Sequence, residues 1–166
     1  MRPTDDDSGA LPGGAELLRQ ERRVRRDGSG LVVADLDGTW QLRQLWPRGG
    51  DRPAAFTALL LRGLRARLEI RAAGSDLLLC NAVTFGPLEL CFRGPGWLAG
   101  RRPLLQFLFR SLEIRLAGRT LLCRTLPDPP ARRLPFFALI ARHPHGWLAA
   151  RGRGGGLALW QRSGTV

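Results

Sequence analysis

The sequence predicts an all-β fold, an antiparallel up-and-down barrel with one or two short helices. From Leu36 onward, apolar and polar residues alternate in short runs, a period typical of strands with one wet and one dry face. Short connectors rich in Gly and Pro separate most of these runs. The first run opens with Gly38 and Trp40, and the last run ends at Arg162. We expect these two strands to pair, because an unpaired edge would expose backbone donors and acceptors, and we expect Arg162 to lie across the Trp40 ring at one end of the barrel.

Residues 1–34 are predicted to form a flexible tail with a short basic helix, and residues 35–163 to form the barrel domain. The tail begins with polar residues, Pro and Gly, which indicate disorder. The run Ala15–Arg26 has the composition of a basic helix with few apolar side chains. This composition favours a solvated arm, and the alternative is a helix that binds a membrane surface or a partner.

Candidate strands fill most of the remaining chain. The stretch Leu68–Gly74 recurs as Leu112–Gly118, and each copy leads through a Gly turn into a Leu-Leu-Cys strand, which predicts successive β-hairpins. Trp40, Leu42 and Gln44 are expected to share one face of the first strand. Eight to ten strands suit a closed barrel whose interior holds side chains plus one small ligand. The candidates are residues 36–46, 67–72, 81–85, 88–92, 104–109, 111–117, 120–125, 136–141, 146–151 and 156–162.

Two kinds of segment connect these strands. Ala54–Leu64 is predicted to form a short helix, which would act as a lid or plug one end of the barrel. Residues 93–100 and 127–135 contain Gly and Pro and are predicted to be connectors.

The chain of 166 residues carries a net charge of +12, and all 26 of its basic residues are Arg. A net charge of this size suggests a surface for nucleic acid or anionic membranes. The absence of Lys indicates a GC-rich coding bias, and the arginines are spread along the chain. A solvated basic surface is therefore the favoured interpretation, while contact with anionic lipid head groups stays open.

The three cysteines, Cys80, Cys91 and Cys123, are odd in number, lack metal-ligand spacing and lie in apolar runs. These features favour small buried side chains in a reducing compartment. The first residues include three consecutive Asp and no apolar segment, so no secretory signal is expected. No apolar stretch reaches the roughly 20 residues of a membrane span, which predicts a soluble or peripheral protein.

No catalytic or metal-binding constellation stands out in the sequence. His143 and His145 flank Pro144 in a predicted loop without a third ligand nearby. Asp35 and Asp37 flank the start of the first strand and are expected to shape its entry. We therefore expect no enzyme, no cofactor and no metal.

Three stretches carry a resemblance to a known family: Leu36–Leu42, Asn81–Val83 in a middle strand, and Gly146–Arg162, where Arg-Gly leads into an apolar strand that ends in Arg. In this order they resemble the plastid lipid-associated proteins, or fibrillins, of plastids and cyanobacteria, over residues 35–162. The resemblance implies a calycin-type, lipocalin-like barrel that holds carotenoids, quinones or other lipids at thylakoid membranes. The family's acidic segment before the closing Arg-Gly is replaced here by Ala141–His145.

The function predicted is non-enzymatic binding of a small hydrophobic molecule, a lipid, carotenoid or quinone. The protein is expected to be cytoplasmic or peripheral to the thylakoid membrane, and its oligomeric state stays open. One alternative is a bilin-binding chaperone or phycobiliprotein lyase of the same barrel class, whose Arg side chains would pair with the pigment's propionates. The other is a basic module for nucleic acid or anionic membranes. For Asn81, a structural hydrogen bond is favoured over a contact with the ligand. For Arg151, a structural role in the last turn is favoured over the alternative that it binds an anion together with Arg153. The candidate ligand-binding or barrel-closing residues are Trp40, Leu42, Asn81, Phe107, Trp147, Arg151, Trp160 and Arg162.

Overall fold

A computed structural model describes residues 11–48 and 65–164, which form two short α-helices, a 3₁₀ turn and ten strands. The predicted helix at 54–64 lies outside the described residues. The elements are α1 Gly14–Asp27, α2 Val33–Leu36, β1 Gly38–Trp46, β2 Arg65–Ala73, β3 Asp76–Phe85, β4 Leu88–Ala99, β5 Leu104–Phe107, β6 Ser111–Leu116, β7 Arg119–Thr125, η1 Ala131–Arg133, β8 Phe136–His143, β9 Trp147–Gly152 and β10 Leu157–Arg162.

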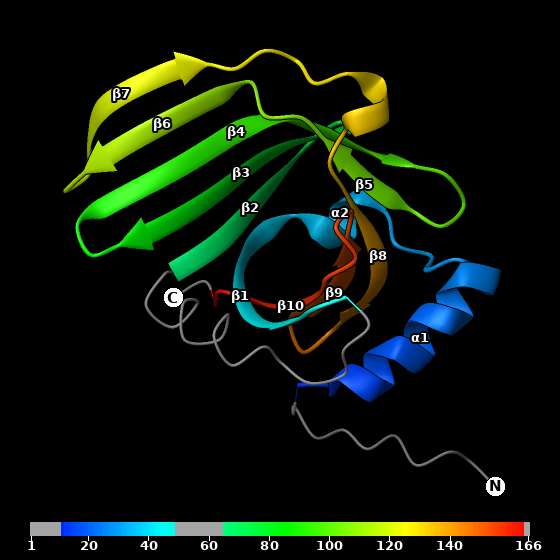
Figure 1. The fold of residues 1–166 in the computed structure, drawn as a ribbon. Coiled ribbons are helices and arrows are strands. Elements are labelled where there is room, and N and C mark those ends of the chain that lie inside the picture. The colour runs from blue at the N-terminus through cyan, green and yellow to red at the C-terminus, as the bar shows by residue number, and fades with distance from the viewer. Residues whose placement is uncertain (1–10, 49–64, 165–166) are drawn as a thin grey trace, which may run out of the picture.

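The predicted antiparallel barrel is confirmed (Figure 1). Eight strands close in the order β1-β2-β3-β4-β5-β8-β9-β10, and β10 returns to pair with β1. The closing pair runs from Trp40 opposite Arg162 to Trp46 opposite Leu157. Every pairing is antiparallel, and neighbours in the barrel follow one another along the chain except where β6 and β7 intervene.

The hairpin β6–β7 lies outside the barrel, because the two halves of β4 pair with different strands along the same edge. Leu88–Arg93 of β4 pairs with β6, while Gly96–Ala99 pairs with β5. The sequence analysis ended this strand at residue 92, but β4 continues through the predicted connector. A Cβ atom on Gly94 would lie 1.8 Å from the carbonyl oxygen of Leu108, so the crossing of these two chain segments requires glycine. The Gly and Pro that suggested a connector therefore belong to a bent strand.

A β-bulge in β1 changes which side chains point inward. The register with β10 shifts between Leu42 and Gln44, so that Leu45 lies opposite Ala158. Because an extra residue reverses the alternation, Leu45 faces the interior with Leu42. The expectation that Gln44 shares the face of Trp40 is therefore wrong.

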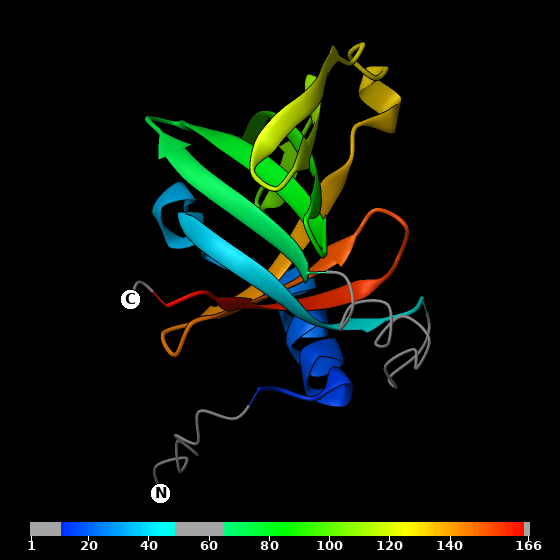
Figure 2. The same cartoon turned by 90° about the vertical axis from the view of Figure 1, so that its left-hand side faces the viewer.

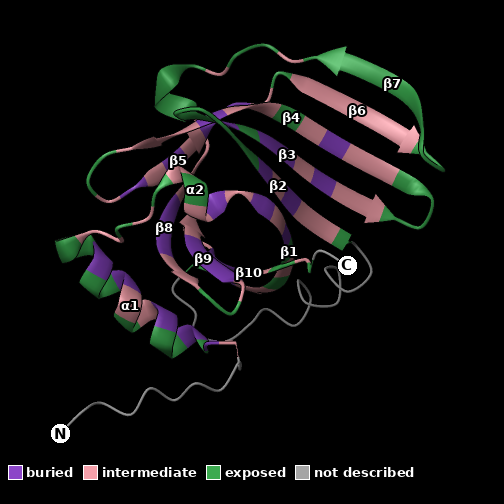
Figure 3. Cartoon of the chain, turned by 180° about the vertical axis from the view of Figure 1, so that it is seen from behind, coloured by how far each residue is buried: buried purple, intermediate pink, exposed green. Residues whose placement is uncertain are grey.

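The main core fills the barrel, and a second apolar cluster lies on its outer wall. Trp40, Ile70 and Leu105 are fully buried inside. Outside, α1 packs against the wall formed by β8, β9 and β10, and Leu17 on α1 is fully buried there beside Trp46. Figure 2 shows α1 beside these strands, and Figure 3 shows that its buried residues form a stripe along the helix. The helix is confirmed, but it is a packed element rather than a solvated arm. No helix among the described residues is long and apolar enough to cross a membrane.

The cysteines differ from the sequence expectation. Cys80 on β3 and Cys91 on β4 form a disulfide with their Cα atoms 6.5 Å apart. Cys123 is a free and exposed thiol on β7. Cys80 and Cys91 are buried as expected, but the expectation that they are reduced is wrong, because strand pairing brings together these two residues 11 apart in sequence. The expected burial of Cys123 is also wrong, because every residue of β7 is exposed.

Candidate functional site

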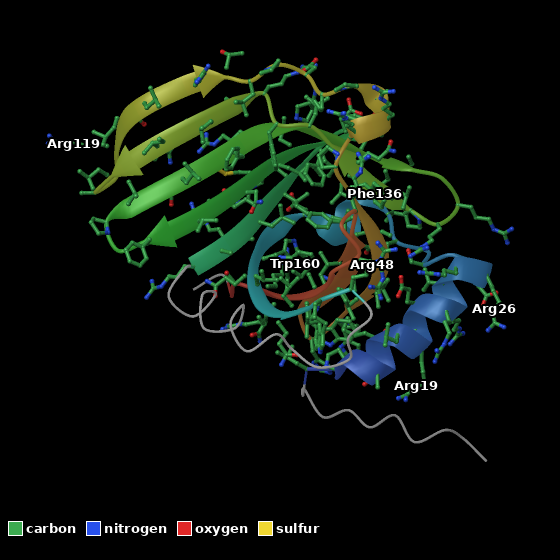
Figure 4. All side chains as sticks on the ribbon, in the orientation of Figure 1. Arg19, Arg26, Arg48, Arg119, Phe136 and Trp160 are labelled. Atoms are coloured by element: carbon green, nitrogen blue, oxygen red, sulfur yellow. A yellow bond between two sulfur atoms is a disulfide. The ribbon has the colours of Figure 1, made fainter. Side chains whose placement is uncertain are left out.

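An apolar cavity of about 290 Å³ lies inside the barrel at the end where β1 finishes and β2 begins. Figure 4 shows Trp160 pointing into the ring of strands at this place. Strand alternation explains the lining, since every second side chain of these strands points inward. The apolar lining residues are Leu42, Leu45, Ala66, Leu68, Val83, Phe137, Ala158 and Trp160.

Besides Arg67, whose guanidinium donates to Glu69 and Glu89, Asn81 provides a polar side chain in this lining. It is half-buried on β3, and its side-chain amide makes no hydrogen bond with the described residues. The structural hydrogen bond favoured by the sequence analysis is therefore not seen in the described part of the chain. The amide offers one donor group and one acceptor oxygen to whatever occupies the cavity.

An aromatic cluster forms one wall of the cavity. The rings of Phe137 and Trp160 meet edge to face with centroids 5.2 Å apart. Phe107 stacks on the far side of Phe137, also at 5.2 Å. Phe107 thus supports a lining residue from the core without lining the cavity itself.

Trp40 and Arg162 meet at the other end of the barrel. The Arg162 guanidinium carbon lies 5.8 Å from the centroid of the Trp40 ring, and its Nη2 donates to the Asp37 carbonyl at 2.9 Å. The Trp40 indole donates to the Leu36 carbonyl at 2.8 Å. Gly38 has φ +144°, and a Cβ there would lie 2.9 Å from Arg162 Nε. The Gly-x-Trp sequence thus leaves room for the arginine that covers the tryptophan.

The apolar inner face continues beyond the barrel onto β3, β4, β6 and β7. Directly opposed residues of paired strands share a face, and the pairs Val83–Leu90, Leu90–Ile114 and Ile114–Leu122 therefore extend the cavity lining outward. One row further out, Phe85, Leu88 and Leu116 share this face and are exposed by 63%, 42% and 42%. We call these seven residues the extended apolar face.

The opposite face of the same strands is charged. Glu89 on β4 accepts from Arg67 on β2 at 2.7 Å and pairs with Arg115 on β6 at 3.5 Å. The hydrogen bond from Arg67 lowers the pKa of Glu89 below its ordinary value. Four of the exposed large apolar residues of these strands, Phe85, Leu88, Leu116 and Leu122, lie on the face that adjoins the cavity, while Leu78 and Leu121 lie off it.

Trp147 and Arg151 do not line the cavity. Leu148 and Ala150 of β9 lie in the interior core, so the residues between them face outward. Trp147 belongs to the outer apolar cluster and stacks on His143, with ring centroids 5.2 Å apart.

Arg151 pairs with a residue that the sequence analysis missed, Glu21 of α1. The carboxylate of Glu21 accepts from Arg151 Nε at 2.7 Å and Nη2 at 2.6 Å, while Arg25 and Arg102 donate at 3.1 and 3.2 Å. Glu21 is only 3% exposed. Burial by itself would raise its pKa, but the hydrogen bonds from Arg151 and Arg25 outweigh burial and lower the pKa from 4.5 to about 2. The sequence does contain a signal for this buried acid. Glu21 is spaced four residues after Leu17 and three before Val24, which places it on the apolar face of the helix.

Described residues include no cluster of three metal-ligating side chains. The fold and the cavity together define a class, an eight-stranded antiparallel barrel around a small apolar cavity. No family model matches the chain, and no curated protein matches it. Among solved structures, a chain titled "REP1-NXSQ fatty acid transporter" is similar with a TM-score of 0.37 and 12% sequence identity, over 80% of this chain and 99% of that chain. A likeness of this size carries no argument about what the present chain binds.

Proposed function

We propose that the barrel binds, without catalysis, one end of a small hydrophobic molecule such as a lipid or a quinone. The observation that carries the proposal is an apolar cavity with a single amide, that of Asn81, that has no partner among the described residues. Apolar walls with a few polar groups are typical of small-molecule sites. Burial of ligand surface would supply the affinity, at about 25 cal/mol per Å².

The volume of the cavity limits which ligands, or which parts of a ligand, fit inside it. A water molecule occupies about 30 Å³ in the liquid, so a cavity of 290 Å³ holds roughly ten non-hydrogen atoms. A quinone ring or the end of an acyl chain matches this volume. A whole carotenoid or the four pyrrole rings of a bilin exceed it, so only part of such a ligand would lie inside the cavity.

The rest of a longer ligand would lie along the extended apolar face. That face adjoins the cavity at Val83 and carries the exposed side chains of Phe85 and Leu122. An acyl or isoprenoid chain bound there would cover apolar surface that water otherwise meets. Membership of the fibrillin family and a position at thylakoid membranes are part of this proposal and rest on the sequence resemblance alone.

Binding can be measured with a short-chain benzoquinone, a fatty acid and a carotenoid, each added to the purified chain while tryptophan fluorescence is recorded. Trp160 lines the cavity, so a quinone bound there should quench part of the signal. The variant Ala66→Leu places three more carbons in the cavity. These carbons displace about three carbons of the ligand, each of which contributes about 0.8 kcal/mol of binding free energy when buried. The substitution should therefore weaken binding by about 2 kcal/mol, or roughly 30-fold in affinity.

The matched control is Ala72→Leu, an exposed position on the same strand that does not line the cavity. It should leave the affinity unchanged. The variant Asn81→Leu should weaken a quinone or a fatty acid more than a pure hydrocarbon, because only the first two present a polar group to the amide. Equal affinities of the Ala66 and Ala72 variants, or no binding by any of the three ligands, would refute the proposal.

A further inference from the structure

A second hollow, of about 830 Å³, lies outside the barrel between α1 and the strands β5, β8 and β9. We call it the arginine cleft. In Figure 4, Arg48 lies between the barrel and α1, whereas Arg19 and Arg26 lie on the far side of the helix. Glu21 is the only acid in the lining, so the formal charge of the cleft is six positive charges less one, or +5. The arginines that line it are Arg22, Arg25, Arg48, Arg102, Arg151 and Arg153.

Glu21 neutralises only part of this charge. Arg25, Arg102 and Arg151 share its one carboxylate. Arg22 and Arg48 make no hydrogen bond or ion pair with the described residues. In addition, Nε of Arg102 is buried without a partner in the described structure, and buried donors normally have one.

The backbone holds the arginines in place. Gly155 has φ +89°, and a Cβ there would lie 2.9 Å from the side chain of Arg48, so the glycine turn gives Arg48 its position. Arg151 Nη1 donates to the Gly155 carbonyl at 2.6 Å. Arg153 donates to the carbonyls of Leu134 and Arg132 at 2.9 and 2.7 Å. The guanidinium groups of Arg151 and Arg153 are therefore held in place by backbone carbonyls, whereas those of Arg22 and Arg48 have no described hydrogen-bond partner and can turn towards a ligand.

Like charges held together in a concave and partly buried site repel one another and attract anions strongly. Planar guanidinium groups match the oxygens of a phosphate group, which they bind through two parallel hydrogen bonds. The remaining lining is partly apolar, with Leu18, Leu104 and Phe136. We propose that the arginine cleft binds the phosphate group of an organic phosphate, held by Arg22, Arg48 and Arg102.

The phosphate could belong to a free small molecule or to a lipid head group. Gly152 lines both the arginine cleft and the apolar cavity, so the two hollows adjoin at the rim of the barrel. Titration with pyrophosphate tests the free form. Flotation with vesicles containing phosphatidic acid, against vesicles of phosphatidylcholine alone, tests the head group.

The decisive comparison uses two double variants of the full chain that remove the same charge. The first, Arg22→Gln with Arg48→Gln, removes the two cleft arginines that have no described partner. The second, Arg19→Gln with Arg26→Gln, removes two exposed arginines from the far side of α1. We expect pyrophosphate, measured by calorimetry at 0.15 M salt, to bind the first variant at least tenfold more weakly than the wild type and the second within twofold.

Neither pair makes a hydrogen bond or ion pair with the described residues, so both variants should unfold within a few degrees of the wild type, which a thermal scan checks. Binding of phosphatidic acid that follows the same pattern, and that pyrophosphate competes away, would assign the site to a head group. Pyrophosphate binding without vesicle binding would assign it to a free phosphate. An equal loss in both double variants, as expected for non-specific attraction of nucleic acid, or no pyrophosphate binding at 0.05 M salt, would overturn the proposal.

Discussion

Replacing Glu21 by Gln tests whether α1 is held to the barrel by a buried ion pair. Glu21 is 3% exposed, and its carboxylate accepts from three arginines, two of them on the barrel. Its pKa of about 2, against an ordinary value of 4.5, corresponds to about 3 kcal/mol of stability above pH 5, at about 1.4 kcal/mol for each pH unit. Losing one partner of a buried pair typically costs about 3–5 kcal/mol, which agrees.

The sign of the pH dependence follows from the direction of the shift. Because the folded pKa is lower than the unfolded one, the stability from Glu21 is fully present above pH 4.5 and is lost as the pH falls from 4.5 to about 2. The free energy of unfolding of Glu21→Gln should be about 3 kcal/mol below that of the wild type at pH 7. This difference should become small at pH 2, because Glu21 is then half protonated in the folded protein and fully protonated in the unfolded one.

The measurement is urea unfolding followed by circular dichroism at several pH values between 2 and 7. Other carboxylates, including Glu89, titrate in both proteins and cancel in the difference. The control is Glu16→Gln, an exposed acid on the same helix whose only described partner is Gln20, and it should change stability by less than about 0.5 kcal/mol. A difference for Glu21→Gln that is below about 1 kcal/mol at pH 7, or that does not vary with pH, would refute the reasoning.

Three further predictions concern the closure of the barrel and the cysteines. Gly38→Ala should lower the free energy of unfolding by about 2–3 kcal/mol, because it forces a side chain into a positive-φ position against Arg162; a loss below 1 kcal/mol would contradict this. Gly94→Ala should lower the free energy of unfolding by more than about 3 kcal/mol, since a backbone carbonyl occupies the space that the new side chain needs. The control Gly154→Ala has open space around it and should change the free energy of unfolding little. Equal stabilities of these two variants would argue against the close crossing at Gly94. Alkylation of the unreduced, denatured chain should modify only Cys123, and all three cysteines after reduction; three modified thiols without reduction would exclude the disulfide.

The positions of most strands were predictable because their period-two alternation is local, whereas the exclusion of β6 and β7 from the barrel was not. The sequence also indicated that Gly38, Trp40 and Arg162 come together, since a barrel must join its first and last strands. Asn81 was marked for its position in a middle strand, and the structure places it in the cavity wall. Local pattern and spatial arrangement agree at these positions.

The remaining features depend on partners far along the chain. The bulge after Leu42 follows from the register with β10, which no local pattern contains. The continuation of β4 through Gly94 depends on a carbonyl of the segment after β5. Glu21 looked like a surface acid of a basic helix because its main partner, Arg151, lies 130 residues away. Such features require tertiary contacts to be known before they can be interpreted.

Closure of the barrel leaves β7 as the one described strand that pairs on a single side. An open edge of this kind is where a second copy of the chain would add, strand against strand. Arg119, Arg124 and the other basic groups of this hairpin oppose such growth, because an antiparallel copy brings like charges together. Their repulsion is screened by salt. Concentrated electrolyte is thus the condition in which two copies would pair through β7, and because each copy has one such described edge, this pairing stops at a dimer.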